Sequence, residues 1–173
     1  MKDWRKLFQN DKLPFYIVEL ADFLAPDDPG RASWAALRAE QAKAAQSVDH
    51  ATLIKNSDTG EWNDIHPLNK KELARRVALQ VKKKVYGHKD IVHSGPLCTA
   101  AAIEGGKIIL SFEAGTDDLM PVAQLKGFAL TGADGRYKWA EATVEGNKVI
   151  VCSEGIAQPT KVRYAWDDNP QEA

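Results

Sequence analysis

The run Phe15-Tyr16-Ile17-Val18-Glu19-Leu20 decides how the first half of the chain folds. It is short and almost continuously apolar, which is typical of a strand covered on both faces of a parallel sheet. A second run of this kind, Ala51-Thr52-Leu53-Ile54, follows later in the chain. The segment between them predicts a helix from Ser33, a favourable N-cap, to Gln46. This order of strand, helix and strand indicates a parallel pair joined by a right-handed crossover.

The clearest helix in the sequence follows the second strand. Asn69 can cap its N-terminus, and Glu72 stands three residues later, as in a capping box. Gly87 ends the helix. Apolar residues repeat at every fourth position and form one stripe: Leu73, Val77, Val81 and Val85. We interpret the basic residues on the other faces as solvated, with a binding patch as the alternative; they are Arg75, Arg76, Lys82, Lys83 and Lys84.

From residue 91 onward the sequence predicts only strands and turns. Residues 102–109 and 143–150 are each typical of a hairpin, with glycine between β-branched flanks. A third turn at 133–136 separates two further short strands, and residues 161–166 close the series. We therefore predict two domains: residues 1–90 with a parallel β-α-β-α pattern, and residues 91–173 as an antiparallel β-sandwich.

The composition excludes several classes of protein. The chain has 173 residues and is 44% hydrophobic, enough for a core in one or two domains. A net charge of -1 gives no argument for nucleic acid or an anionic membrane surface. No apolar run predicts a membrane-spanning helix, and the first residues lack the apolar core of a signal peptide. Cys98, Cys152 and the four histidines lack metal-site spacing, so we expect no metal and no other cofactor.

The loop before the long helix carries the candidate catalytic residues. It contains Asp64-Ile65-His66-Pro67 and follows the second strand, so it falls at the C-terminal edge of the parallel pair, where functional loops lie. An aspartate two residues before a histidine can hold the imidazole in one tautomer. Such a histidine can act as a general base towards a hydroxyl nucleophile. The alternative is an Asx-turn beside a surface histidine.

Several stretches resemble the sialate O-acetylesterases, which are carbohydrate esterases of the serine SGNH-hydrolase type. In the first half they are residues 14–21, Trp34 with Arg38 and Gln41, and Asp64-Ile65-His66-Pro67 with Asn69-Lys70. In the second half they are residues 94–96, 125–128 and 163–170. The stretches keep the family's order over essentially the whole chain. The resemblance implies that residues 1–90 are the C-terminal part of a flavodoxin-like SGNH-hydrolase domain, followed by a β-sandwich at 91–173.

The resemblance also implies a chemistry. Family members remove O-acetyl groups from sugars, such as sialic acid or plant-type glycans, through an acyl-serine intermediate. His66 matches their general base, and Asp64 would be the acid that orients it. The wider superfamily places this acid three residues before the histidine, where this chain has Asn63, so the choice between Asn63 and Asp64 stays open. For the full-length protein, the resemblance suggests a periplasmic, secreted or lysosomal location.

The family's nucleophile has no counterpart in this sequence. In the family it lies on a Gly-x-Ser-type turn early in the catalytic domain, and none of the six serines has that context. We therefore expect a C-terminal portion of the esterase that supplies base and acid without the serine. Because an unpaired strand edge recruits partners, we also expect the chain to bind the N-terminal half of the esterase or to self-associate; the alternative is a rearranged packing in which the β-sandwich covers the sheet.

Two other hypotheses stay open. In the first, the chain is a sugar-binding or structural β-sandwich module with an inert esterase remnant. Its aromatic residues would then stack on sugar rings, although packing in a core is the alternative; they are Tyr137, Trp139, Tyr164 and Trp166. In the second, the chain is a complete small hydrolase that uses Ser57, which lies near the motif but lacks a nucleophile-elbow pattern.

Overall fold

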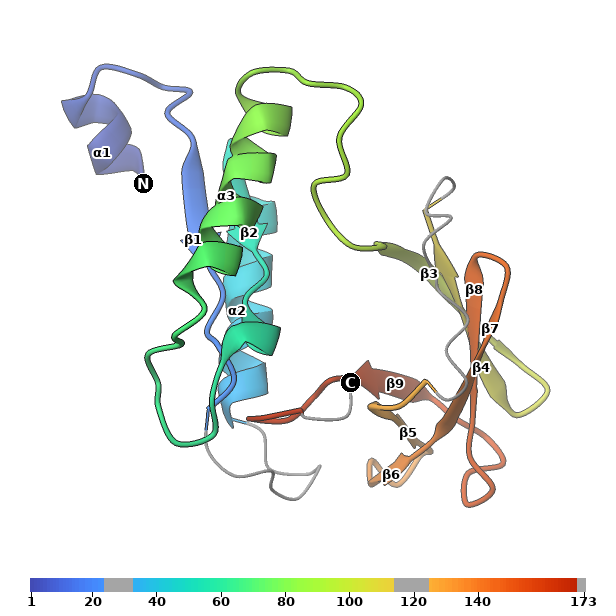
Figure 1. The fold of residues 1–173 in the computed structure, drawn as a ribbon. Helices are drawn as coiled ribbons and strands as arrows, with labels where there is room; N and C mark the ends of the chain where they lie inside the picture. Colours follow the sequence, from blue (N-terminus) through green and yellow to red (C-terminus); the bar gives the residue numbers. More distant parts are fainter. Residues whose placement is uncertain (24–32, 114–124, 171–173) are drawn as a thin grey trace. The chain divides into compact units, whose positions relative to one another are not determined.

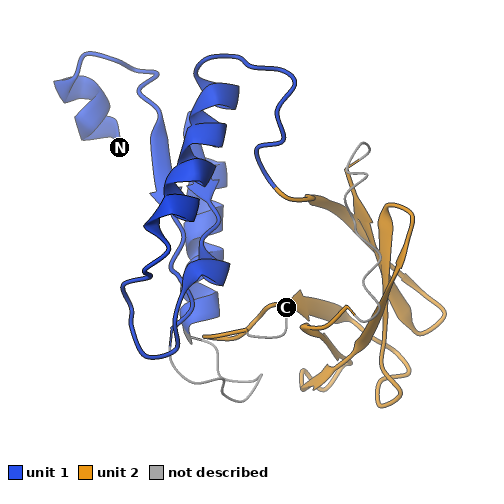
Figure 2. Ribbon diagram, viewed as in Figure 1, with its two compact units in different colours: residues 1–25, 33–94 blue, residues 26–32, 95–173 orange. Residues whose placement is uncertain are grey.

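The computed structural model describes residues 1–23, 33–113 and 125–170. These residues form two compact units, each described here by itself (Figure 1, Figure 2). Of the described residues, the first unit contains 1–23 and 33–94, and the second contains 95–170. One small parallel sheet and two antiparallel sheets confirm the mixed α/β and β class. The finer assignments, an SGNH-hydrolase segment and a β-sandwich, stay predictions.

The first unit is built around two parallel strands, β1 and β2. Its elements are α1 (Lys2–Leu7), β1 (Phe15–Val18), α2 (Ser33–Ser47), β2 (Ala51–Ile54), the short 3-10 helix η1 (Ser57–Thr59) and α3 (Lys70–Lys84). The strands pair in register from Phe15 opposite Ala51 to Val18 opposite Ile54. Both α2 and α3 pack on β2, and Figure 1 shows them running alongside the strands. The helix α1 was not predicted from the sequence.

Strand β1 is shorter and less covered than predicted. It ends at Val18, which is 41% exposed, and Phe15, Tyr16 and Ile17 are only half-buried. The prediction of a strand covered on both faces is therefore wrong for β1. The physical reason is that the described sheet has only two strands, so each keeps an unpaired edge and two helices cannot cover it fully.

Helix α2 holds the chain after β1 through polar side chains. The Gln41 side chain donates to the Val18 carbonyl at 3.1 Å and accepts from the Leu20 N–H at 3.0 Å. Trp34 Nε1 donates to the Ala21 carbonyl at 2.8 Å. Trp34 and Gln41 lie two turns apart on one face of α2, so both side chains reach the same segment. They bond the backbone groups of Val18, Leu20 and Ala21, which a further strand could otherwise bond. The side chain of Ser33, the predicted cap, lies outside the described part of the structure.

The predicted start of α3 is confirmed. The Asn69 side chain accepts the Glu72 N–H at 3.2 Å, which satisfies one of the free donors of the first turn. The helix ends at Lys84, shortly before Gly87, whose φ of 70° lies in the region that glycine adopts readily. None of the described helices is long and apolar enough to cross a membrane.

The second unit consists of two antiparallel sheets. Their strands are β3 (Cys98–Glu104), β4 (Lys107–Phe112), β5 (Phe128–Thr131), β6 (Tyr137–Trp139), β7 (Glu141–Glu145), β8 (Lys148–Cys152) and β9 (Lys161–Tyr164). The strand orders are β3-β4-β8-β7 and β6-β5-β9. The predicted hairpins are present, and Gly105 and Gly106 form the first turn with φ values of 53° and 82°. Strands of both sheets contribute to one buried cluster: Ile108, Leu110, Phe128, Leu130, Val149, Val151 and Ile156.

Candidate active site

The loop that carries Asp64 and His66 joins β2 to α3. It follows the carboxyl end of β2, the position predicted from the sequence for a functional loop. The helix η1 forms its first part. Further on, an isolated antiparallel bridge joins Glu61 and Asp64, and the Asp64 N–H donates to the Glu61 carbonyl at 3.4 Å. The two candidate residues thus lie on a tight turn.

One oxygen of Asp64 contacts His66 twice. Asp64 Oδ1 accepts the backbone N–H of His66 at 2.8 Å, which is an Asx-turn, and it lies 3.2 Å from Nδ1 of the His66 ring. A carboxylate at this place favours the tautomer that carries its proton on Nδ1. The other ring nitrogen, Nε2, is then the proton acceptor that a general base needs.

The pair is open to solvent. The side chain of His66 is 84% exposed and that of Asp64 is 47% exposed. Hydrogen bonds from the backbone N–H and from the ring of His66 lower the pKa of Asp64 below its usual value. Asp64 is therefore a carboxylate at neutral pH, the form that can accept the Nδ1 proton.

Asn63 is the alternative acid position. It is exposed, and within the described residues its side chain makes no hydrogen bond to His66, whose Nδ1 is already paired with Asp64. The geometry thus favours Asp64 as the orienting group.

Large apolar side chains on the same loop are also exposed. Trp62 is 60% exposed, Ile65 is 44% exposed and Leu68 is 76% exposed. All three lie within four residues of His66 in the sequence. Exposed apolar side chains gathered on one loop are typical of a surface that binds another molecule.

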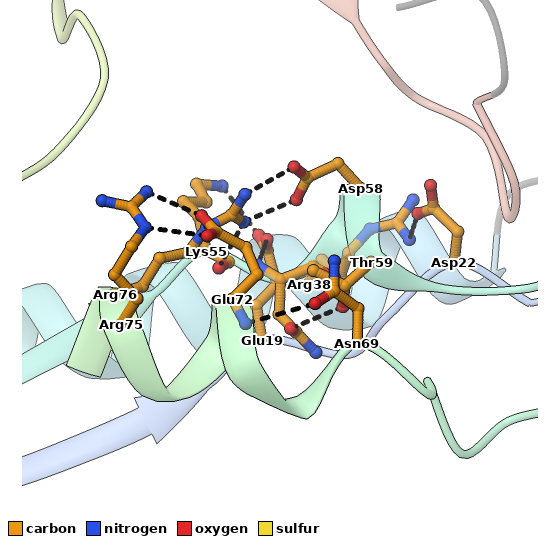
Figure 3. A network of polar contacts seen from close by, with 11 residues as sticks. Glu19, Asp22, Arg38, Lys55, Asp58, Thr59, Asn69, Glu72, Arg75 and Arg76 are labelled. Atoms are coloured by element: carbon orange, nitrogen blue, oxygen red, sulfur yellow. Dashed lines mark hydrogen bonds and ion pairs between the residues drawn. The ribbon is translucent and has the colours of Figure 1, made fainter. Parts of the chain in front are cut away.

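Buried polar groups fasten the start of the loop to the chain after β1 (Figure 3). The Glu19 side chain is 2% exposed; it pairs with Lys55 Nζ at 2.7 Å and accepts the Asn56 N–H at 3.2 Å. The backbone N–H of Asp22 donates to the Ser57 carbonyl at 3.1 Å. These bonds fix the direction in which the loop leaves β2.

The Asp22 side chain is itself buried against α2. Its carboxylate pairs with Arg38 Nη1 at 2.9 Å, and both side chains are nearly inaccessible to solvent. Burial raises the pKa of Asp22 to about 7, although Arg38 opposes the rise. The segment after β1, to which the start of the loop is bonded, is thus held by three side chains of α2: Trp34, Arg38 and Gln41.

This polar network was not predicted from the sequence. The interpretation of the basic face of α3 as solvated is wrong for Arg76, whose side chain is 23% exposed and pairs with Asp58 and Glu72. The spacing of Glu72 and Arg76 is a recognisable helix pair. Asp58 is not recognisable as their partner, because it lies 18 residues from Arg76 in the sequence.

A nucleophile beside His66 is not present in the described residues. No serine hydroxyl within them is hydrogen-bonded to the His66 ring. Ser57, the internal candidate, is half-buried in η1, where its carbonyl accepts the Asp22 N–H. The part of the chain that the structure describes also contains no cluster of three or more His, Cys, Asp or Glu residues able to hold a metal ion.

The aromatic residues considered for sugar stacking mostly have protein partners. The Arg163 guanidinium lies over the Tyr137 ring at 3.8 Å and over the Trp166 ring at 4.7 Å. Tyr164 packs on Phe128, with ring centroids 4.6 Å apart. Trp139 is 56% exposed. Packing therefore accounts for three of the four, and Trp139 keeps a free ring surface.

No protein-family model and no curated protein matches the chain. Among solved structures, a carbohydrate acetylesterase from Xanthomonas citri matches 99% of this chain with 35% sequence identity and a TM-score of 0.89. The chain resembles part of a carbohydrate acetylesterase. It spans 40% of the length of that enzyme. The likeness supports the carbohydrate-esterase part of the sequence-based prediction, whereas sialate specificity and the SGNH type stay predictions.

Proposed function

We propose that this chain is the C-terminal portion of a sialate or related carbohydrate O-acetylesterase, and that it supplies His66 as general base and Asp64 as the acid that orients it. The observation that carries the proposal is the 3.2 Å contact between Asp64 Oδ1 and His66 Nδ1 on a loop at the carboxyl end of β2. The similarity to a carbohydrate acetylesterase supports it.

In this proposal the serine comes from a second polypeptide segment. His66 Nε2 accepts the proton of the serine hydroxyl as its oxygen attacks the acetyl carbonyl carbon. Asp64 stabilises the imidazolium that forms. The imidazolium then gives its proton to the departing sugar oxygen, which leaves an acetyl-serine. Water, activated by His66 in the same way, releases acetate and restores the serine.

The partner that we propose is the N-terminal half of the esterase, with self-association as the alternative. Three features of the first unit support a partner: the unpaired edge of β1, the exposed apolar side chains of the catalytic loop and an apolar face of α3. That face is an open groove lined by Lys70, Leu73, Ala74, Val77, Ala78, Val81, Lys82 and Tyr86. A strand added beside β1 would pair its free backbone groups and bury Val18.

Each of the two parts of the chain has its own place in this proposal. We propose that residues 1–90 complete an SGNH-hydrolase domain, while residues 91–173 form a β-sandwich that belongs to the same enzyme. Substrates in this proposal are O-acetylated sugars, either sialic acid or a plant-type glycan.

A chimera tests the proposal. The matched 40% of the Xanthomonas citri acetylesterase is replaced by this chain, and acetate release is measured from O-acetylated sialic acid and from an acetylated plant-type glycan. We expect release from at least one of them at a rate well above that of the remaining part of the enzyme alone. A folded chimera that releases acetate no faster than that part contradicts the proposal.

The exposed Trp139 supports a second candidate, a sugar-binding module. If this is the function, the isolated chain binds deacetylated glycans, and Trp139→Ala abolishes the binding, whereas the acetylesterase proposal needs no such binding. Calorimetric titration of both variants separates the two candidates.

A further inference from the structure

The side chain of Arg76 ties the start of the loop that carries Asp64 and His66 to α3, the helix that follows the loop. The loop starts after β2 and ends at α3, and Arg76 lies in the second turn of α3. Its Nη1 and Nη2 atoms donate to the two carboxylate oxygens of Asp58 at 2.5 and 2.6 Å. Nη1 also donates to the Lys55 carbonyl at 3.0 Å. The guanidinium therefore holds the first residues of the loop directly against the helix that follows it (Figure 3).

Arg76 is itself held in place. Its Nε donates to Glu72 Oε1 at 2.9 Å, and its side chain is 23% exposed. The Glu72 N–H is the group that the Asn69 side chain caps. The planar fork of arginine matches a carboxylate with two parallel bonds, so it fixes orientation as well as distance. Lysine at this position keeps the charge but loses that geometry.

We propose that Arg76 is a positioning residue for the candidate catalytic pair, which holds the loop between Lys55 and Asn69 in the shape that places Asp64 against His66. This inference rests on the proposed function for its effect on catalysis. Asp58 is 63% exposed, so its pair with Arg76 contributes little to folding. Its main effect is on the geometry of the loop.

The neighbouring Arg75 is a matched control. It also pairs with Glu72, with both bonds at 2.7 Å, and it has the same charge on the same helix. Within the described residues it makes no hydrogen bond or ion pair with the loop, and its side chain is 59% exposed. Arg75→Lys therefore keeps the charge and alters the Glu72 contact without releasing Asp58.

The first measurement needs no catalysis. Nitrogen-15 NMR of the chain reports the tautomer of the His66 ring, which the Asp64 contact biases towards a proton on Nδ1. We expect Arg76→Lys and Asp58→Asn each to shift this population towards the Nε2-protonated tautomer that a free histidine side chain prefers, whereas Arg75→Lys leaves it unchanged. Asp58→Asn serves as the second variant should Arg76→Lys fail to fold, because Asp58 is largely exposed. An unchanged tautomer in folded Asp58→Asn and Arg76→Lys overturns the inference.

The second measurement is made in the chimera. We expect Arg76→Lys to lower kcat by about 10²-fold with little change in KM, as a displacement of about 1 Å in a catalytic group does. The double variant with Asp58→Asn should lose no more than Arg76→Lys alone, because the substitution of Asp58 breaks an interaction that Arg76→Lys already breaks. Equal losses in Arg75→Lys and Arg76→Lys overturn the inference. An inactive chimera contradicts only the proposed function, and the NMR result then decides the positioning role.

Discussion

Asp64 Oδ1 lies 2.8 Å from the backbone nitrogen of His66 and 3.2 Å from Nδ1 of its ring, so one oxygen fixes both the turn and the imidazole. The two contacts have different consequences. The backbone contact belongs to the turn and needs only an oxygen acceptor. The ring contact needs an ionised carboxylate, because only that form stabilises a positively charged imidazole.

This difference predicts how substitutions at the two acid positions behave in the chimera. Asp64→Asn keeps an oxygen for the turn but removes the charge, so we expect kcat to fall by roughly 10⁴-fold, as for other triad acids. Asn63→Ala removes a side chain that does not contact the ring and should change kcat by less than about threefold. Acetate release measured under single-turnover conditions gives both values. A large loss of kcat in Asn63→Ala together with a small loss in Asp64→Asn would instead assign Asn63 as the residue that orients His66.

The isolated chain should be a poor esterase. Removing the nucleophile from a triad leaves only residual catalysis, and no serine hydroxyl of the described residues is hydrogen-bonded to His66. We expect hydrolysis of p-nitrophenyl acetate at a rate close to that of free imidazole at equal concentration. Ser57→Ala should leave this rate unchanged. Fast turnover that Ser57→Ala abolishes would instead favour a complete small hydrolase.

Much of the fold could be predicted from the sequence because its signals are local. The cap at Asn69 and the two-glycine turn at Gly105-Gly106 each need only a few neighbouring residues. The end of β1 could not be predicted in this way. The strand ends at Val18, and the next residue, Glu19, binds Lys55 and Asn56 through its carboxylate, more than thirty positions later in the sequence.

The candidate site also has a part that could be predicted from neighbouring residues and a part that could not. Asp64 and His66 are two residues apart, so their contact follows from a turn that the sequence indicates. The residues that hold the loop come from distant segments: Glu19 and Asp22 from after β1, Arg38 from α2 and Arg76 from α3. A single sequence gives no signal for such pairs. The apolar run at residues 15–20 also led to a prediction of too much burial for β1, because such a run does not show how many strands the sheet contains.

The buried Asp22 predicts a pH dependence of stability. Its pKa rises from 3.8 to about 7 on folding, chiefly because of burial. Since the folded form binds the proton more tightly, its stability contribution is complete below about pH 4 and is lost as the pH rises through 7. Asp22→Asn keeps an acceptor for Arg38 without a titrating group. We expect the Tm of the natural chain to fall by several degrees relative to Asp22→Asn between pH 4 and pH 8. Parallel Tm curves would show that Asp22 stays ionised as a partner of Arg38.

Gly60 packs so closely against the backbone of Asp22 that no side chain fits at this position. A Cβ atom at this position would lie 2.1 Å from the carbonyl oxygen and 2.4 Å from the nitrogen of Asp22, both backbone atoms. Gly60→Ala should therefore destabilise the chain by about 1–3 kcal/mol or more. At Gly95 an added Cβ meets nothing within 4 Å, so Gly95→Ala should be neutral or stabilise by up to about 1 kcal/mol. Urea denaturation of both variants makes the comparison, and equal midpoints would contradict this close packing.

The most direct test of the central claim is the effect of His66→Ala on kcat for acetate release by the chimera. His88→Ala is the matched control, since His88 is also exposed and lies outside the loop. The account predicts a loss of several orders of magnitude for His66→Ala, towards the ~10⁶-fold seen for triad histidines, and no change for His88→Ala. An active chimera in which His66→Ala keeps full kcat would contradict the account, because His66 could not then be its general base.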